Sequence, residues 1–128
     1  MKVEDIDLLS KDLCGRLPYW VKCVAISDGY IGCISSIESQ YGVVTFDDGR
    51  QEEICDIKPY LFPLSNMTEE QYGEYTDMGY SVTERWWSMA NYHQIDWCNK
   101  NHFDYRGLIE NGLAIDATGL NIYKEETK

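Results

Sequence analysis

The alternation of apolar and polar positions begins with a helical period. In residues 5–16, apolar side chains recur every three or four positions, and polar side chains fall between them. The apolar positions are Ile6, Leu9, Leu13 and Leu17, and the polar positions are Asp7, Lys11, Asp12 and Arg16. This period predicts one amphipathic helix that lies across a sheet or its open end. Pro18 cannot continue a helix, so we expect the helix to end before it.

Residues 21–63 follow the pattern of short strands, because β-branched and aromatic residues gather in runs separated by turn residues. The runs are Val21–Ile26, Ile31–Ile37, Val43–Phe46 and Gln51–Ile57. Their connections are too short for parallel crossovers, so they favour an antiparallel meander with a hairpin at Asp47-Asp48-Gly49. Gly32 predicts a bulge or sharp bend in the second strand. Pro59 is expected to stop the ladder.

A helix start follows the strand segment. Thr68 and Gln71 have the spacing of a capping box, which predicts a helix over Glu69–Met78. Residues 80–90 leave two alternatives. Either a helix capped by Thr83 runs on through Cys98, or a loop precedes a new helix start at Asn91.

The last third of the chain has one further helix signal. Asp104 is a suitable N-cap for a short helix over Tyr105–Asn111, and Gly112 suits the left-handed position that ends such a helix. Residues 113–123 contain two apolar pieces around a turn, which predicts a small hairpin or an extended segment that packs on the body of the protein.

Together these patterns predict an α+β protein. We expect a single domain over residues 1–128, with a helix at 5–16, a small antiparallel curled sheet or barrel at 21–63 and a mostly helical part at 68–123.

The central segment resembles SH3-like and Tudor-like barrels. The residues that carry this resemblance are Gly29-Tyr30-Ile31-Gly32-Cys33-Ile34, Val43-Val44-Thr45-Phe46-Asp47-Asp48-Gly49, Ile54, Asp56-Ile57-Lys58-Pro59-Tyr60 and Leu61-Phe62. Tudor-type barrels hold cations in an aromatic cage, which would map onto Tyr30, Tyr41 and Phe46, with Asp48 as the counter-charge. The strand alternation offers the other interpretation, in which Phe46 belongs to the core.

Charge narrows the classes of partner. The chain of 128 residues carries 22 acidic and 11 basic side chains, for a formal net charge of -11, and has no basic patch. Binding to nucleic acid or to anionic lipid is therefore disfavoured. The chain shows neither a secretory pattern at its start nor an apolar run of membrane-spanning length, so we expect a cytoplasmic protein. The acidity fits a basic partner, imitation of DNA, or an ordinary acidic protein.

The candidate catalytic and metal-binding residues form no complete motif. Five cysteines without a C-x-x-C pair predict free thiols, with no bound metal or cofactor. Cys98 and His102 would share a helical face if the helix continued to His102, but no other catalytic motif accompanies them. Asp47-Asp48 and Glu52-Glu53 form an acidic corner of the kind that can bind a divalent cation. We do not expect an enzyme.

Aromatic residues provide the strongest indication of function. Ten tyrosines and four tryptophans exceed what a core of this size can hide. The candidate binding residues are Tyr30 and Tyr41 on the sheet segment and Trp86 and Trp87 in the later part. This surplus favours a non-catalytic protein that binds another protein.

A second resemblance concerns the setting of the protein. Residues 58–72, and residues 102–110 through 121–123, resemble small uncharacterised proteins of Bacteroides-type gut bacteria, often found near prophage or mobile-element genes. This resemblance implies an accessory role in a mobile element and no particular chemistry. The alternative function is therefore a phage-type counter-defence protein that sequesters a nucleotide signal or presents an acidic surface in imitation of a ligand.

Overall fold

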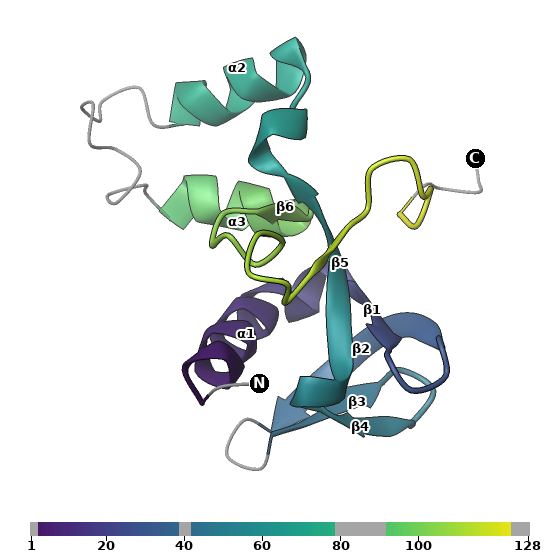
Figure 1. Ribbon diagram of the computed structural model, residues 1–128. Coiled ribbons are helices and arrows are strands. Elements are labelled where there is room, and N and C mark those ends of the chain that lie inside the picture. The colour runs from purple at the N-terminus through teal and green to yellow at the C-terminus, as the bar shows by residue number, and fades with distance from the viewer. Residues whose placement is uncertain (1–2, 39–41, 79–91, 124–128) are drawn as a thin grey trace.

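The computed structural model describes residues 3–38, 42–78 and 92–123, which form an α+β fold (Figure 1). The helices are α1 (Val3–Arg16), α2 (Glu69–Met78) and α3 (Tyr92–Lys100). The strands are β1 (Lys22–Ala25), β2 (Ile31–Glu38), β3 (Val43–Phe46), β4 (Gln51–Glu53), β5 (Ile57–Pro63), β6 (Phe103–Asp104) and β7 (Ile115–Asp116). Short 3₁₀ turns cover Leu17–Tyr19, Ile54–Asp56 and Leu64–Asn66. The predicted helix at the start and the strand order β1 to β4 are confirmed.

The sheet is mixed and is not closed into a barrel, so the barrel alternative is wrong. Its strands run in the order β4-β3-β2-β1-β5-β6, with β7 also paired to β5. β1 to β5 pair antiparallel with their neighbours, whereas β6 and β7 lie parallel to β5. Closure fails because β5 continues past the end of β1 and takes new partners from the C-terminal part of the chain.

Pro59 lies inside β5, opposite Cys23, and does not stop the ladder as the sequence predicted. Asp56 accepts a hydrogen bond from the Ile26 amide on the β1 side. Because successive residues of a strand turn their N–H groups to opposite edges, the missing N–H of Pro59 faces away from β1. Proline is tolerated where the ladder needs no donor. The predicted strand Gln51–Ile57 is therefore two strands separated by the turn at Ile54–Asp56.

Gly32 is not the bulge that the sequence predicted. The register of β2 against β3 shifts between Ile34 and Ser36, further along the strand. A Cβ atom on Gly32 would lie 3.1 Å from the Phe46 ring and 3.2 Å from the Tyr30 ring. Glycine is therefore needed at this position so that two aromatic side chains can pack against the strand.

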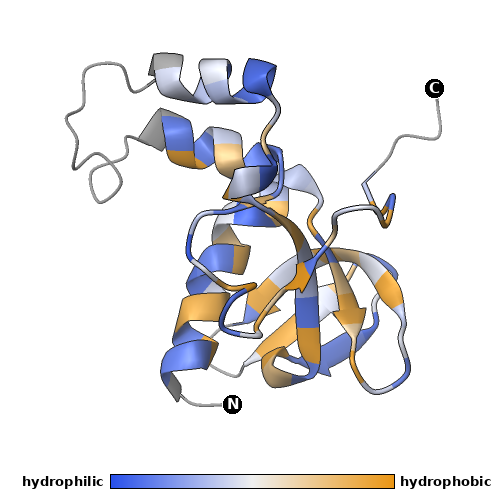
Figure 2. Ribbon diagram, turned by 45° about the horizontal axis from the view of Figure 1, so that its top comes forward, coloured by the Kyte–Doolittle hydropathy of each residue, from blue (hydrophilic) through white to orange (hydrophobic). Residues whose placement is uncertain are grey.

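The main core lies between α1 and the sheet (Figure 2). Leu9 and Leu13 of α1 are fully buried against the inward side chains of the sheet, which include Cys23, Ile34 and Phe46. A second cluster joins α2, α3 and β6 around Tyr75, Cys98 and Phe103, with Trp97 stacked on Phe103 at 5.5 Å between ring centroids. Cys98 and Phe103 are both buried in this second cluster.

Two polar residues of α1 are buried rather than solvated. The sequence pattern grouped Asp12 and Arg16 with the polar positions, but both side chains have 0% exposure. Arg16 Nε lies 2.6 Å from Asp12 Oδ2, and Arg16 also donates to the carbonyl of Phe103 at 2.7 Å. Arg106 Nε reaches the other oxygen of Asp12 at 3.2 Å. The cluster joins α1 to β6 and to the segment that follows it.

A tyrosine hydroxyl completes the sheet where β1 and β5 separate. The register that pairs Cys23 with Pro59 would next pair Lys22 with Tyr60. Instead, the Tyr123 hydroxyl accepts from the Lys22 amide at 2.7 Å and donates to the Tyr60 carbonyl at 2.8 Å. Tyr123 thereby replaces one rung of the ladder and anchors the C-terminal segment to the sheet.

The capping box is confirmed, because the Thr68 amide donates to Gln71 Oε1 at 2.9 Å and the Gln71 amide donates to Thr68 Oγ1 at 3.1 Å. The predicted helix Glu69–Met78 follows it. The two alternatives for residues 80–90, a helix or a loop, concern residues 79–91, which lie outside the described part of the chain.

The predicted helix Tyr105–Asn111 is wrong, and the segment forms consecutive turns. The Asp104 carboxylate accepts from the backbone amides of Arg106, Leu108 and Ile109, so it satisfies a turn instead of capping a helix. Gly112 has φ 76°, as its predicted left-handed role requires. Residues 113–123 take the extended alternative, with β7 paired to β5.

The ion cluster of α1 yields the first prediction. Arg16→Met should lower the free energy of unfolding by about 3 kcal/mol, because the buried Asp12 carboxylate and the Phe103 carbonyl lose their shared donor. Urea unfolding measures the change. Lys11→Met, which removes an exposed cation from the same helix, is the control and should shift stability by less than about 0.5 kcal/mol. Equal effects of the two variants would contradict the structural role of Arg16.

The second prediction concerns the Tyr123 hydroxyl, which replaces one pair of hydrogen bonds between β1 and β5. Tyr123→Phe should cost about 1–2 kcal/mol of stability, because it keeps the ring and leaves the Lys22 amide and Tyr60 carbonyl without this partner. Tyr72→Phe removes a hydroxyl from a tyrosine that is exposed on α2. It should leave the urea midpoint unchanged, and a Tyr123→Phe variant as stable as the parent would refute the assignment.

Candidate binding surface

The most exposed apolar residues of the described sheet lie on the outer side of β1 and β2. Val24 pairs with Ile31, so the two side chains share one side of the sheet, opposite to the buried Cys23. Ile31 is 44% exposed, and Ile26, which continues the alternation beyond β1, is 52% exposed. We call this side, defined by Val24, Ile26, Ile31 and Cys33, the β1–β2 outer face. Lys22 and Lys58 share it, because they pair with Cys33 and Val24.

Trp20 extends this surface at its far end. The residue follows the turn Leu17–Tyr19 in a left-handed conformation, with φ 61°, and its side chain is 66% exposed. Its carbonyl lies 3.6 Å from the Cys33 thiol, which places the Trp20 backbone beside the β1–β2 outer face. Trp20 is not among the binding residues predicted from the sequence. The signal was Pro18, which ends the helix and leaves the next aromatic residues in a tight turn.

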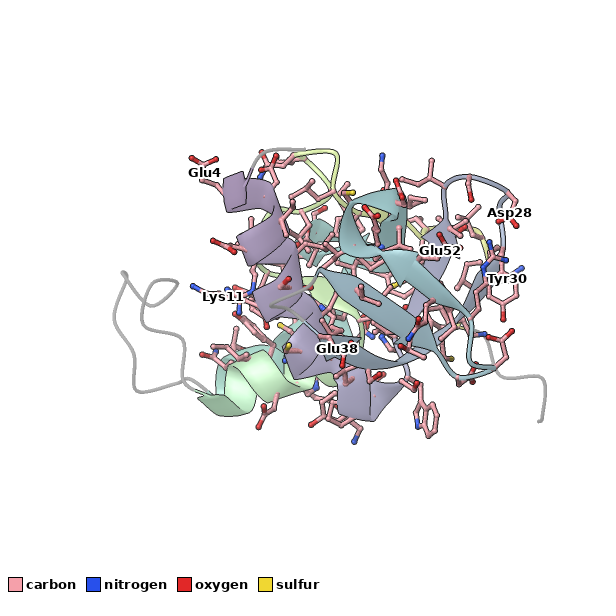
Figure 3. The ribbon with its side chains drawn as sticks, turned by 90° about the horizontal axis from the view of Figure 1, so that it is seen from below. Glu4, Lys11, Asp28, Tyr30, Glu38 and Glu52 are labelled. Atoms are coloured by element: carbon pink, nitrogen blue, oxygen red, sulfur yellow. The ribbon has the colours of Figure 1, made fainter. Side chains whose placement is uncertain are left out.

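A network of charges joins the tips of the two hairpins at one end of the sheet. Arg50 donates to both oxygens of Asp28, at 2.9 and 2.8 Å, and to Glu52 at 2.8 Å. The Tyr30 hydroxyl donates to Asp48 at 2.5 Å. Figure 3 shows Asp28, Tyr30 and Glu52 at this end, away from Lys11 on α1. We call these residues the hairpin-tip network.

The network fixes the protonation states of its members. The hydrogen bond from Arg50 holds the pKa of Asp28 below its usual value, and the bond from Tyr30 does the same for Asp48. The pKa of Tyr30 is raised, chiefly because its hydroxyl donates to Asp48. Both carboxylates therefore stay charged at neutral pH, next to the exposed apolar side chains of Ile26 and Ile31.

Tyr30 does not offer an open cage wall in this arrangement. The Arg50 guanidinium lies over its ring, 4.6 Å from the centroid, and Phe46 meets the ring at 5.2 Å in an edge geometry. Phe46 itself is fully buried, as the core interpretation predicted. The protein's own arginine thus occupies the position that an external cation would take on Tyr30.

The other three predicted binding residues, Tyr41, Trp86 and Trp87, lie outside the described residues. Only Tyr30 of the predicted set can be placed. Trp97, in contrast, packs between Tyr75 and Phe103 and donates to Glu74 at 3.2 Å, so it holds α2 to α3.

Cys98 and His102 do not form a nucleophile and base. α3 ends at Lys100, and His102 follows it with φ 63°, off the helical face that the pairing required. Burial raises the pKa of Cys98 to about 12, so the thiol stays protonated at neutral pH. Burial lowers the pKa of His102 to about 4, with smaller contributions from Arg16 and Lys22. A neutral imidazole and a protonated thiol on separate elements give no activated nucleophile.

The residues of the predicted acidic corner do not act as one group, because Asp48 and Glu52 are hydrogen-bonded to other side chains. Asp48 and Glu52 belong to the hairpin-tip network. Next to it, Glu53, Cys55 and Asp56 place their ligand atoms within 4.8 Å of one another. Desolvation raises the pKa of the Cys55 thiol most, and the neighbouring carboxylates raise it further. This environment disfavours the thiolate form, which is the form that binds zinc. All five cysteines lie in the described residues and are free.

Comparisons of the chain with protein-family models, curated proteins and solved structures gave no significant match. Across residues 3–38, 42–78 and 92–123, no helix has both the length and the apolar character needed to cross a membrane.

The partly buried imidazole of His102 makes stability depend on pH. The folded-state pKa of His102, about 4, lies below the ordinary value of 6.5. The unfolded chain therefore binds the proton first, and stability falls as the pH drops from about 6.5 to about 4, by about 3 kcal/mol for this group.

His102→Asn tests this contribution, because asparagine cannot titrate and tolerates positive φ. Urea unfolding between pH 7 and pH 4.5 should show a smaller loss of stability in the variant than in the parent. Identical pH dependence in the two proteins would mean that His102 is protonated as readily in the fold as outside it.

Proposed function

We propose that the protein acts by non-catalytic binding to another protein through the β1–β2 outer face and Trp20, and that the partner surface is apolar at its centre and basic where it meets the Ile26 end of the face. The observation that carries this proposal is the exposure of three large apolar side chains: Trp20 just before β1, Ile26 just after it and Ile31 at the start of β2. Tryptophan is enriched among the residues that carry most of the binding energy of protein interfaces.

The pairing of the β1–β2 hairpin holds the proposed binding surface rigid before a partner binds. β1 is held between β2 and β5 by antiparallel pairing on both edges, so the backbone under Val24 and Ile31 has a fixed register. The hairpin-tip network adds a second constraint, since Arg50 connects the β3–β4 turn to Asp28 in the β1–β2 turn. Side chains on such a scaffold lose little conformational freedom when a partner binds.

Charge supports the choice of partner. Asp28 follows Ile26 in the β1–β2 turn, Asp48 is hydrogen-bonded to Tyr30 of that turn, and the Asp56 carbonyl accepts from the Ile26 amide. The acidic groups therefore gather at the Ile26 end, whereas Lys22 and Lys58 lie further along the face, opposite Cys33 and Val24. The chain as a whole carries a formal charge of -11. Two copies of this surface would repel each other, whereas a basic protein would be attracted and steered to it.

The predicted binding residues Trp86 and Trp87 could contribute a second contact area, and the proposal does not depend on them. Catalysis receives no support from the described residues, since Cys98 and His102 belong to separate elements and neither is in a reactive state. The mobile-element setting implied by the sequence resemblance is compatible with a binding role.

Site-specific photo-crosslinking provides a test. A photoreactive side chain at position 31 should crosslink one defined protein in the native host, and the same group at position 72, which is exposed on α2, should not. The yield at position 31 should fall when the salt concentration is raised, because charged contacts are screened.

The matched variant Ile26→Thr with Trp20→Ser should lower this crosslinking at least about tenfold without changing the melting temperature, because hot-spot side chains carry most of the binding energy. If position 72 crosslinks the same protein equally well, or if crosslinking survives the double variant, the proposed surface is wrong.

A further inference from the structure

A cleft of about 550 Å³ lies next to the anchored C-terminal segment. Phe62 of β5, Lys100 at the end of α3 and the following Asn101 and His102 form part of its wall. Residues 117–123 close it, with Asn121 and Tyr123 among the lining residues. Figure 1 shows this segment, in yellow, passing β5 on its way to the C-terminus. The volume is in the range of sites for small molecules.

The cleft differs in charge from the rest of the protein. Its described lining residues include Lys100 and no carboxylate, although the chain has twice as many acidic as basic side chains. The two charged groups whose fields act on His102 are Arg16 and Lys22, and both are cations. The Lys22 ammonium is held nearby, 3.0 Å from the carbonyl of Ile122. An anion would therefore find a locally favourable potential here in an otherwise repulsive protein.

Two rings and several amides give the cleft its shape and polarity. The His102 imidazole stacks on Tyr123, with centroids 3.6 Å apart and planes 9° apart. His102 Nδ1 is buried and has no hydrogen-bond partner among the described residues. Both His102 and Asn121 have positive φ, 63° and 57°. Such backbone positions are often found at functional sites, and an unpaired buried nitrogen is unusual where it has no role.

We propose that this cleft binds a small organic anion with a planar, hydrogen-bonding ring, and that nucleoside 5′-monophosphates are the class that fits it. Lys100 attracts the phosphate, and the exposed parts of the His102–Tyr123 pair and Phe62 contact the base. The Asn121 amide and the Asn101 side-chain oxygen offer donors and acceptors of the kind that pair with base edges, while Asn101 Nδ2 donates to the Trp97 carbonyl at 2.9 Å. The described lining of the cleft shares no residue with Val24, Ile26, Ile31 and Cys33, which define the β1–β2 outer face.

Isothermal titration of the full chain with AMP, GMP, CMP and UMP is the test, with each matching nucleoside and inorganic phosphate as the other arms. At least one monophosphate should bind saturably with a Kd below about 1 mM. It should bind at least about tenfold more tightly than its nucleoside or phosphate alone, because ring and anion contribute together. Absence of saturable binding, or equal binding of nucleoside and nucleotide, overturns the proposal.

Two variants locate the site. Lys100→Gln should weaken binding about fivefold, a factor typical of one exposed ion pair. Asn121→Gly removes an amide while keeping positive φ accessible, and it should also weaken binding. Lys11→Gln on α1 removes an exposed cation outside the cleft and should leave the Kd unchanged. If Lys11→Gln weakens binding as much as Lys100→Gln does, the ligand responds to overall charge and the cleft is not its site.

Discussion

The buried carboxylate of Asp12 is the constraint on which the arrangement of the two halves of the chain depends. An ionised group without water must be surrounded by donors, and here Arg16 from the same helix and Arg106 from the far end of the sequence supply them. Arg16 also uses a donor on the Phe103 carbonyl. α1 therefore does more than cover the sheet with Leu9 and Leu13, because its polar stripe fixes where β6 and the turn after it must lie. Apolar packing tolerates small shifts of a helix, whereas this cluster requires one position.

Once β6 is fixed, the division of β5 follows. The first half of β5 pairs with β1, and the second half needs another partner, which β6 supplies through the hydrogen bond from the Phe62 amide to the His102 carbonyl. Between the two halves, the Tyr123 hydroxyl occupies the rung where β1 and β5 separate. The same separation creates the two surfaces. β1 turns its outer face towards solvent, while the junction of β5, His102 and the C-terminal segment forms walls of the cleft.

Local signals in the sequence were sufficient for the elements whose cause is local. The period of Leu9 and Leu13, the turn at Asp47-Asp48-Gly49 and the capping box at Thr68 each depend on neighbouring residues, and each was predicted. Two-residue strands such as β6 and β7 have no period to detect, and their pairing depends on contacts across more than forty residues of sequence, as the partnership of Phe62 with Phe103 shows. Asp12 and Arg16 have the i, i+4 spacing of an ion pair, but its burial depends on Phe103 and Arg106, which no local pattern connects to them. For the candidate site, the sequence identified the aromatic surplus and Tyr30. It could not show that Arg50 covers Tyr30 or that Trp20 remains exposed.

The two proposed binding surfaces differ in the charge of the groups around them. Asp28 and Asp48 keep their charge at one end of the sheet, because hydrogen bonds from Arg50 and Tyr30 lower their pKa values. Around His102, cations act on a neutral imidazole in a cleft whose described lining has no carboxylate. A net charge near -11 would by itself repel every anion. On the proposed assignments, a cleft without this local repulsion would select a small anion, and the acidic Ile26 end of the β1–β2 outer face would select a basic protein. The two proposed sites would then attract opposite charges, and each would discriminate against the ligand of the other.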